Sequence, residues 1–164
     1  MPASTDNNDG RRRRKSVHLN KTAYQRGCFF VTLCCEGRQR RFGRIVDGEM
    51  HLNALGTVAR DAIDMLPRYI AGLRIVCHVV MPDHVHFMAY LGDGATKGLS
   101  EVITAYKKRV IHLCAEICSA QGCDLGSLWQ RNYYEHIVRD SDEADKIRAY
   151  ICNNPAKWQA EGKG

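Results

Sequence analysis

The sequence predicts an α+β fold in which helices pack on a ferredoxin-like antiparallel sheet. The elements expected along the chain follow the order strand, hairpin, helix, strand, strand, helix, strand, helix, which is close to the split βαβ arrangement. A length of 164 residues and a hydrophobic content of 45% suit one globular domain of ordinary size. The sequence shows no internal repeat and no second domain. We therefore expect a single folded unit.

Short apolar, β-prone segments predict the strands. We expect strands at residues 28–35, 44–46, 50–52, 73–80, 84–90 and 133–138. Asp47-Gly48 separates the second and third of these, which is a strong signal for a hairpin. Met81-Pro82-Asp83 joins the fourth and the fifth.

Capping residues and prolines predict the helix boundaries. Asn53 is a suitable cap for a helix that ends near Leu66, before Pro67. A second helix with an apolar stripe is expected over residues 99–120. Asp140 and Glu143 resemble a capping box at the start of the last helix. We expect that helix to end at Asn153 or Asn154, because a residue before proline avoids the α region.

Basic charge is concentrated at the start of the chain. Residues 1–44 hold 11 Lys and Arg against 3 Asp and Glu, whereas the remaining 120 residues hold 13 against 15. We expect residues 1–20 to be a disordered basic arm, residues 21–158 the folded domain and residues 159–164 a short tail. The arm either meets a polyanion such as nucleic acid or serves as a solubilising tail.

No apolar run approaches the roughly 18 to 20 residues that a membrane-spanning helix needs. The N-terminus also lacks the apolar stretch of a secretory signal. We therefore expect a cytoplasmic protein whose eight cysteines are reduced thiols, most of them in the core. A structural zinc site at Cys114, Cys118 and Cys123 is the alternative for part of this set, although no C-x-x-C pair is present.

The candidate chemistry begins with His84 and His86 in the apolar run DHVHFMAY. In a strand, alternation places both imidazoles on one face, where they can converge on a single divalent ion. Asp83 precedes them and by the same alternation lies off their face. A solvated strand face with two polar residues is the alternative.

Tyr150 and Asn154 form the second constellation, because residues four apart share a helix face. Ile147 and Ile151 lie on the same side, so this face is expected to turn toward the sheet and leave Tyr150 buried or half-buried. Either Tyr150 is a core tyrosine with an ordinary hydrogen-bond partner, or it is a phenolic nucleophile one turn from an amide that completes a metal site.

Four segments in fixed order carry a family resemblance. They are GCFFVTLCCEGRQRRFGRIVDGEMHLNALG, VVMPDHVHF, LWQRNYYEHIVRD and YICNNPAKW. Together they resemble the REP-associated tyrosine transposases, which belong to the single-tyrosine HUH transposases that act on single-stranded DNA. The resemblance covers residues from about 11 to 158, and the agreement of separated segments in order and spacing makes it specific.

The resemblance implies roles for particular residues. His84, His86 and Asn154 correspond to ligands of Mg²⁺ or Mn²⁺, and Tyr150 to the nucleophile that forms a 5′-phosphotyrosine link. Tyr133 and Tyr134 are rivals, although their position favours a strand role, with Tyr134 packing inward. The implied substrate is single-stranded or hairpin DNA from repetitive extragenic palindromes, which implies association with the nucleoid. The family contains both monomers and homodimers, so the oligomeric state stays open.

Basic side chains are expected to bind the DNA backbone, with a solvated surface as the alternative for those on the long helix. The candidates are Arg11, Arg12, Arg13, Arg14, Lys15, Lys21, Lys107, Lys108 and Arg131. Trp129 precedes the last strand and is expected to fill the core rather than stack on bases. The competing functions are a metal-dependent DNA strand transferase or nickase, a non-catalytic regulator that binds hairpin nucleic acid, and, more remotely, a small metal-dependent hydrolase.

Overall fold

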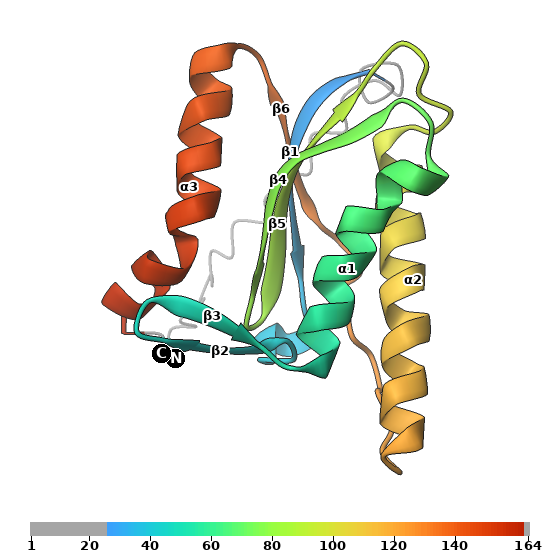
Figure 1. The fold of residues 1–164 in the computed structure, drawn as a ribbon, viewed down its shortest axis with the longest axis vertical. Helices are drawn as coiled ribbons and strands as arrows, with labels where there is room; N and C mark the ends of the chain where they lie inside the picture. Colours follow the sequence, from blue (N-terminus) through green and yellow to red (C-terminus); the bar gives the residue numbers. More distant parts are fainter. Residues whose placement is uncertain (1–25, 163–164) are drawn as a thin grey trace, which may run out of the picture.

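A four-stranded antiparallel sheet forms the centre of the molecule (Figure 1). The structure is a computed structural model that describes residues 26–162. Its sheet has the order β4-β5-β1-β6. The strands are β1 (Gly27–Cys34), β4 (Leu73–Met81), β5 (His84–Leu91) and β6 (Tyr134–Val138). Every neighbouring pair is antiparallel, which confirms the predicted ferredoxin-like sheet.

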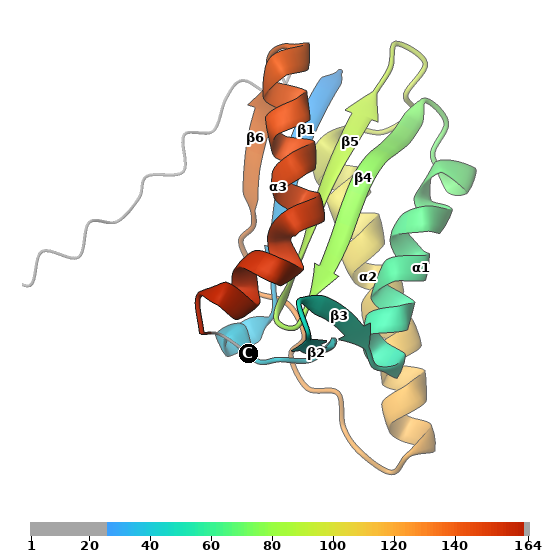
Figure 2. The same cartoon turned by 60° about the vertical axis from the view of Figure 1, so that its left-hand side comes forward.

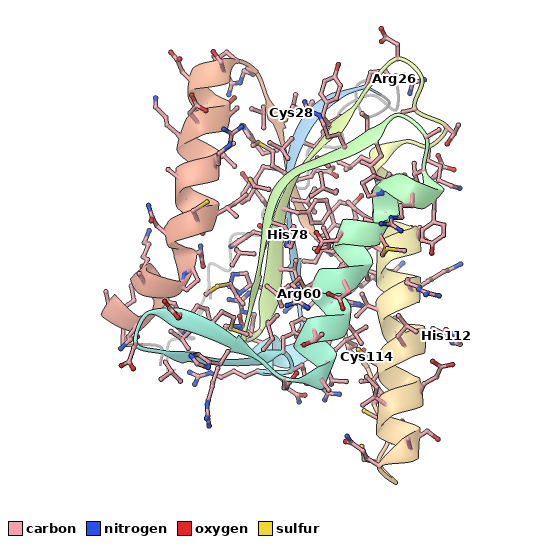
Figure 3. All side chains as sticks on the ribbon, in the orientation of Figure 1. Arg26, Cys28, Arg60, His78, His112 and Cys114 are labelled. Atoms are coloured by element: carbon pink, nitrogen blue, oxygen red, sulfur yellow. The ribbon has the colours of Figure 1, made fainter. Side chains whose placement is uncertain are left out.

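The three helices divide between the two faces of this sheet, as Figure 1 shows. Helices α1 (Ala54–Tyr69) and α2 (Leu99–Ala120) cover one face, and α3 (Ser141–Ala160) covers the other. Side chains fill the space between the layers on both faces (Figure 3). Within residues 26–162 no helix is long and apolar enough to cross a membrane.

Strand alternation separates a large core from a small one. Phe29, Val31 and Leu33 of β1 are fully buried in the large core against α1 and α2. The alternate residues of β1 face α3, where Ile151 packs on Met88 in a smaller cluster. The face beneath α3 thus has room for polar groups beside a limited apolar contact.

Aromatic packing ties the loop before β6 to the large core. The Trp129 ring lies 5.3 Å from Phe42 and 5.9 Å from Tyr106, between ring centroids. Tyr106 is fully buried and donates its hydroxyl hydrogen to the carbonyl of Ala59 at 3.0 Å, which links α2 to α1. The core role predicted for Trp129 is confirmed.

A short hairpin supports the end of α3. Strands β2 (Gly43–Val46) and β3 (Glu49–Leu52) follow the single turn η2 (Glu36–Arg38). The predicted Asp47-Gly48 turn is confirmed, with positive φ angles of 51° and 76° that suit a tight hairpin. The backbone N–H of Gly48 donates to the side chain of Gln159, which anchors the hairpin to the last turns of α3.

Both helix ends predicted from prolines are wrong. Pro67 lies inside α1 and Pro155 inside α3, which continues to Ala160 and so includes residues assigned to a tail. Ile151, Asn154 and Trp158 are all buried on one side of α3, and we attribute the continued helix to this burial, which outweighs the hydrogen bond that proline cannot make. Figure 2 shows the last turns of α3 bending from the line of its first part.

The eight cysteines are all free thiols. Burial raises the pKa of Cys35 to about 12 and that of Cys114 to about 11, so these two are unreactive core residues. Cys123 is exposed and donates to the carbonyl of Cys118 at 3.3 Å. In the described part of the chain, no group of three or more His, Cys, Asp or Glu side chains is arranged to hold a metal ion.

Candidate active site

Two histidines of β5 meet beneath α3. His84 and His86 alternate with the core residues Val85 and Phe87, so both imidazoles face α3. Each histidine is only 5% exposed. Their Nε2 atoms lie 3.0 Å apart and their ring centroids 4.5 Å apart. The predicted convergence of the two imidazoles is thus present in the fold.

Each imidazole is oriented through its other nitrogen. Nδ1 of His84 lies 2.5 Å from a carboxylate oxygen of Asp83, and Nδ1 of His86 lies 2.8 Å from the hydroxyl of Thr32. Thr32 is the direct partner of His86 in the pairing of β1 with β5. Such partners at Nδ1 are typical of metal-binding histidines, because they fix the ring and leave Nε2 free.

Asp83 corrects the prediction that its side chain lies off the histidine face. It belongs to the turn between β4 and β5, where strand alternation does not apply. Its carboxylate is buried, with one oxygen on His84 and the other 3.0 Å from Nε of Arg38. A buried carboxylate needs such partners, so Asp83 links the imidazole to a cation.

The environment keeps His86 neutral. Burial, reinforced by the neighbouring His84 and by Arg38, lowers the pKa of His86 to about 3. At neutral pH the His86 ring is therefore uncharged. Two nitrogen atoms 3.0 Å apart need a proton or a cation between them. The separation is close to that of adjacent ligands around an octahedral ion with bonds of about 2.1 Å.

Helix α3 brings Tyr150 and Asn154 to the same cleft. The Tyr150 ring lies 5.4 Å from His86 and 6.1 Å from Phe30, between centroids, and 41% of the residue is exposed. Asn154 is buried one turn further along. Both residues line a cleft of about 330 Å³ together with His84 and His86.

The cleft also contains residues that the sequence analysis missed. They are Thr32, Arg38, Lys157, Trp158 and Glu161. Lys157 lies 5.6 Å from the centroid of the Tyr150 ring, and the Trp158 ring lies 5.6 Å from that of His84. Lys157 and Trp158 follow Pro155. Because the helix was predicted to end before this proline, neither residue was expected to lie on it near the site. Thr32 could have been found as the polar residue in the apolar run 28–35.

A family model described as "Transposase IS200 like" matches residues 69–154, which is more than half of the chain. The matched range contains His84, His86, Tyr150 and Asn154. The chain belongs to the IS200-like transposase family. Members of this family typically use a divalent metal ion.

The chain is also similar to individual proteins. The chain is 29% identical to a Haemophilus influenzae protein of uncharacterised function, over 96% of this chain and 97% of the relative. It is 22% identical to a second protein of that organism, named provisionally as a REP-associated tyrosine transposase, over 80% of this chain and 71% of the relative. A solved structure of a REP-associated tyrosine transposase bound to a REP hairpin is similar with a TM-score of 0.60 and 25% identity, over 81% of this chain and 68% of that one.

The donor set of this IS200-like transposase fits a divalent ion. Two imidazoles present Nε2 to one point, and the Asn154 amide lines the same cleft. Nitrogen and amide oxygen ligands suit Mn²⁺ and, less strongly, Mg²⁺. Because none of the three is a carboxylate, we expect modest metal affinity.

The rival tyrosines lie outside this cleft. Tyr134 is 58% exposed and is paired with Thr32 on the face of the sheet that carries the histidines, which corrects the expectation that it packs inward. Its ring lies 6.2 Å from Phe30. Tyr133 is the tyrosine that packs against the large core, with Lys107 placed 5.8 Å over its ring.

The predicted DNA-binding residues of the IS200-like transposase fall into three groups. Arg11, Arg12, Arg13, Arg14, Lys15 and Lys21 lie outside the described residues. Lys107 donates to the carbonyl of Gln130 at 2.8 Å, and burial lowers its pKa, so it braces α2 against the loop before β6. Lys108 and Arg131 are exposed but do not line the cleft.

Proposed function

We propose that this IS200-like transposase cuts and rejoins single-stranded DNA through a covalent bond to Tyr150. The observation that carries the proposal is that the Tyr150 ring lies 5.4 Å from His86, in one chain and in one cleft. A protein that only binds DNA needs neither a buried pair of imidazoles nor a tyrosine beside them. We assign the activity to the domain predicted over residues 21–158.

The imidazoles supply the metal site in this proposal. His84, His86 and Asn154 would hold Mg²⁺ or Mn²⁺, which when bound polarises a phosphate oxygen. The pKa of His86, lowered to about 3, keeps its ring neutral and able to bind a cation at neutral pH. Asp83 and Thr32 hold the two rings in the required orientation through Nδ1.

Tyr150 carries the chemical step. Its phenolic oxygen forms a bond to phosphorus while the bond from phosphorus to the 3′ oxygen breaks. The products are a 5′-phosphotyrosine link and a free 3′-OH. The proton that the phenol loses is transferred to this 3′ oxygen. One phosphodiester replaces another of similar energy, so a 3′-OH can reverse or redirect the step without ATP.

We infer a hairpin with a short single-stranded extension as the substrate class. The support is the similar solved structure, which contains a REP hairpin. The basic residues predicted from the sequence would bind the backbone of this DNA, with an affinity that falls as salt rises. Lys108 and Arg131 are the exposed candidates within the described residues.

The test is incubation of the protein with labelled hairpin DNA and Mn²⁺, followed by denaturing electrophoresis. We expect an SDS-resistant adduct that is lost in Tyr150→Phe and kept in Tyr133→Phe and Tyr134→Phe. Hairpin binding without any adduct, in wild type and variants alike, would instead favour the non-catalytic regulator. An adduct that persists in Tyr150→Phe would show that the nucleophile is another residue.

A further inference from the structure

Arg38 is a fixed cation at the wall of the cleft. Its Nε lies 3.0 Å from Asp83, and one of its terminal amino groups lies 2.8 Å from the sulfur of Cys34. Cys34 pairs with His84 across β1 and β5, so both contacts hold the guanidinium beside the histidine pair. Arg38 lines the cleft that also contains His86 and Tyr150.

The backbone around Arg38 is shaped to present this side chain. Arg38 has a φ of 56°, a left-handed conformation that residues other than glycine rarely adopt. Its N–H donates to the carbonyl of Cys35 at 3.1 Å, and the N–H of Glu36 donates to Leu128 at 2.9 Å. Backbone strain of this kind persists only where surrounding contacts enforce it and is frequent at functional sites.

The guanidinium has donors to spare. It carries five N–H groups, and its contacts with Asp83 and Cys34 use two of them. The side chain is 49% exposed, whereas its partner Asp83 is 6% exposed, so the cation remains accessible from the cleft while its counter-ion is hidden. A planar fork with free N–H groups matches the two non-bridging oxygens of a phosphodiester.

The second cation of the cleft, Lys157, is held in place less firmly than Arg38. Lys157 has a side chain that is 61% exposed, and its only described ionic partner, Glu161, is 3.9 Å away. A lysine is a point charge on a flexible stem, which must be ordered when it binds. Arg38 is therefore the cation of the cleft that is already ordered for an anion.

We propose that Arg38 is a phosphate-binding residue, which contacts the non-bridging oxygens of one phosphodiester in the single-stranded part of the DNA, beside His84 and His86. This inference rests on the proposed function for the identity of the ligand. It adds a specific subsite to the cleft: one backbone phosphate is held by the guanidinium next to the tyrosine. A purely structural alternative is that Arg38 only holds Asp83 against His84.

Neutral backbone linkages distinguish these two roles. Each phosphate of the single-stranded extension is replaced in turn by a methylphosphonate, and equilibrium binding is measured in EDTA. All proteins carry Tyr150→Phe, so no linkage is cut and binding alone is measured. We expect one linkage at which the methylphosphonate weakens binding about 10-fold, the usual size of a charged hydrogen bond.

The same linkage should lose its effect when Arg38 is changed. Arg38→Gln should bind the all-phosphate DNA about 10-fold more weakly and bind the methylphosphonate DNA as the parent does. Arg44→Gln, a change at an exposed arginine of β2, is the matched control and should retain the discrimination at that linkage. Arg38→Lys keeps the charge without the paired N–H groups of the guanidinium. It should still bind the all-phosphate DNA more tightly than the methylphosphonate DNA, but by a smaller factor, and it replaces Arg38→Gln as the test variant if Arg38→Gln does not fold.

Three results would overturn the proposal. They are the absence of any sensitive linkage in the parent, equal weakening of both DNAs by Arg38→Gln, and an Arg38→Lys variant that binds both DNAs equally. Because binding is measured without cleavage, these results do not depend on the identity of the nucleophile. An adduct at Tyr150 with no sensitive linkage would leave the proposed function intact and remove only this subsite.

Discussion

Asp83 connects two groups of the cleft, the imidazole of His84 and the guanidinium of Arg38. One of its oxygens holds Nδ1 of His84 and the other holds Nε of Arg38. The residue is 4% exposed, and a carboxylate so deeply buried is stable only with such partners. Its charge also favours the tautomer of His84 in which Nε2 carries a lone pair.

This arrangement predicts the effect of Asp83→Asn on metal binding. The amide keeps the shape of the side chain but lacks the negative charge that fixes the His84 tautomer. We expect the affinity for Mn²⁺, measured by calorimetric titration of the folded protein, to fall about 10- to 100-fold.

Asp61→Asn is the matched control, because Asp61 is exposed on α1 and its ion pair within residues 26–162 is with Arg60. It should leave the Mn²⁺ affinity unchanged. An Asp83→Asn variant with the affinity of the wild type would mean that Asp83 does not orient a metal ligand.

At the residue scale, the sequence predicted the groups whose placement follows from a local period. His84 and His86 follow the period of a strand, and Tyr150 and Asn154 that of a helix. Asp83 and Arg38 follow no such period. One lies in a turn and the other in a left-handed conformation, and tertiary contacts decide where both side chains point.

Helix α3 is the element that completes the cleft. It presents Tyr150 and Asn154 before the bend, and Lys157 and Trp158 after Pro155. The Trp158 ring packs 5.6 Å from that of His84, and the β2–β3 hairpin holds the same turns through Gln159. The end of α3 thus covers the histidine pair on this face of the sheet.

The change Trp158→Ala tests whether α3 continues past Pro155. Trp158 is only 8% exposed, so its removal should lower the free energy of unfolding by about 3 kcal/mol in urea denaturation. The neighbouring Lys157→Ala should change this free energy by less than about 0.5 kcal/mol. A helix that ended at Asn154 would leave Trp158 in a surface tail, and both changes would then have equally small effects.

The start of α3 predicts a dependence of stability on pH. Glu143 accepts a hydrogen bond from the backbone N–H of Arg139 at 2.7 Å and lies 2.6 Å from Nε2 of His136. These contacts hold the pKa of Glu143 below its usual range, with the backbone bond the larger cause. A carboxylate of this kind stabilises the fold above its unfolded pKa of about 4.3, and this stability is lost as pH falls through the lower folded value.

Glu143→Gln should remove that dependence. The free energy of unfolding, measured in urea at pH 7 and at pH 3, should fall less in this variant than in the wild type. Glu116→Gln changes an exposed glutamate whose ion pair, among the residues that the structure describes, is with His112, and the fall in this variant should match that of the wild type. If Glu143→Gln also matches the wild type, the contacts of Glu143 do not stabilise the start of α3.

At the element scale, capping signals proved reliable and prolines did not. The side chain of Asn53 accepts from the N–H of Gly56 at 2.9 Å, and that of Asp140 from Glu143 at 2.8 Å, as their sequences predicted. A cap is a local interaction that neighbouring residues decide. The helices pass Pro67 and Pro155 because burial beyond each proline, at Ile70 and Trp158, stabilises the continuation, and that burial depends on the whole fold.

Over the whole molecule, the sheet separates the large apolar core from the candidate active site. The face covered by α1 and α2 contains the large apolar core, and the face covered by α3 contains the cleft with a smaller apolar cluster. The order of the elements along the chain and the antiparallel sheet were predicted from the sequence, and the structure has both. The described residues hold 17 Lys and Arg against 16 Asp and Glu, so most of the basic excess lies in residues 1–25.

The structure also predicts that one chain makes one complete site, because Tyr150 and His86 meet within it. Tyr150→Phe and His86→Ala should each abolish the DNA adduct, and an equimolar mixture of the two variants should remain inactive. Recovery of the adduct in the mixture would show that the tyrosine of one chain acts with the histidines of another.

Mapping the adduct by mass spectrometry tests the central claim most directly. After digestion of the protein–DNA adduct with nuclease and trypsin, we expect the nucleotide on the peptide of residues 149–157, which contains Tyr150 as its only tyrosine. A nucleotide on the peptide of residues 132–139, which contains Tyr133 and Tyr134, would contradict the account, because the tyrosine beside the histidine pair would then not be the nucleophile.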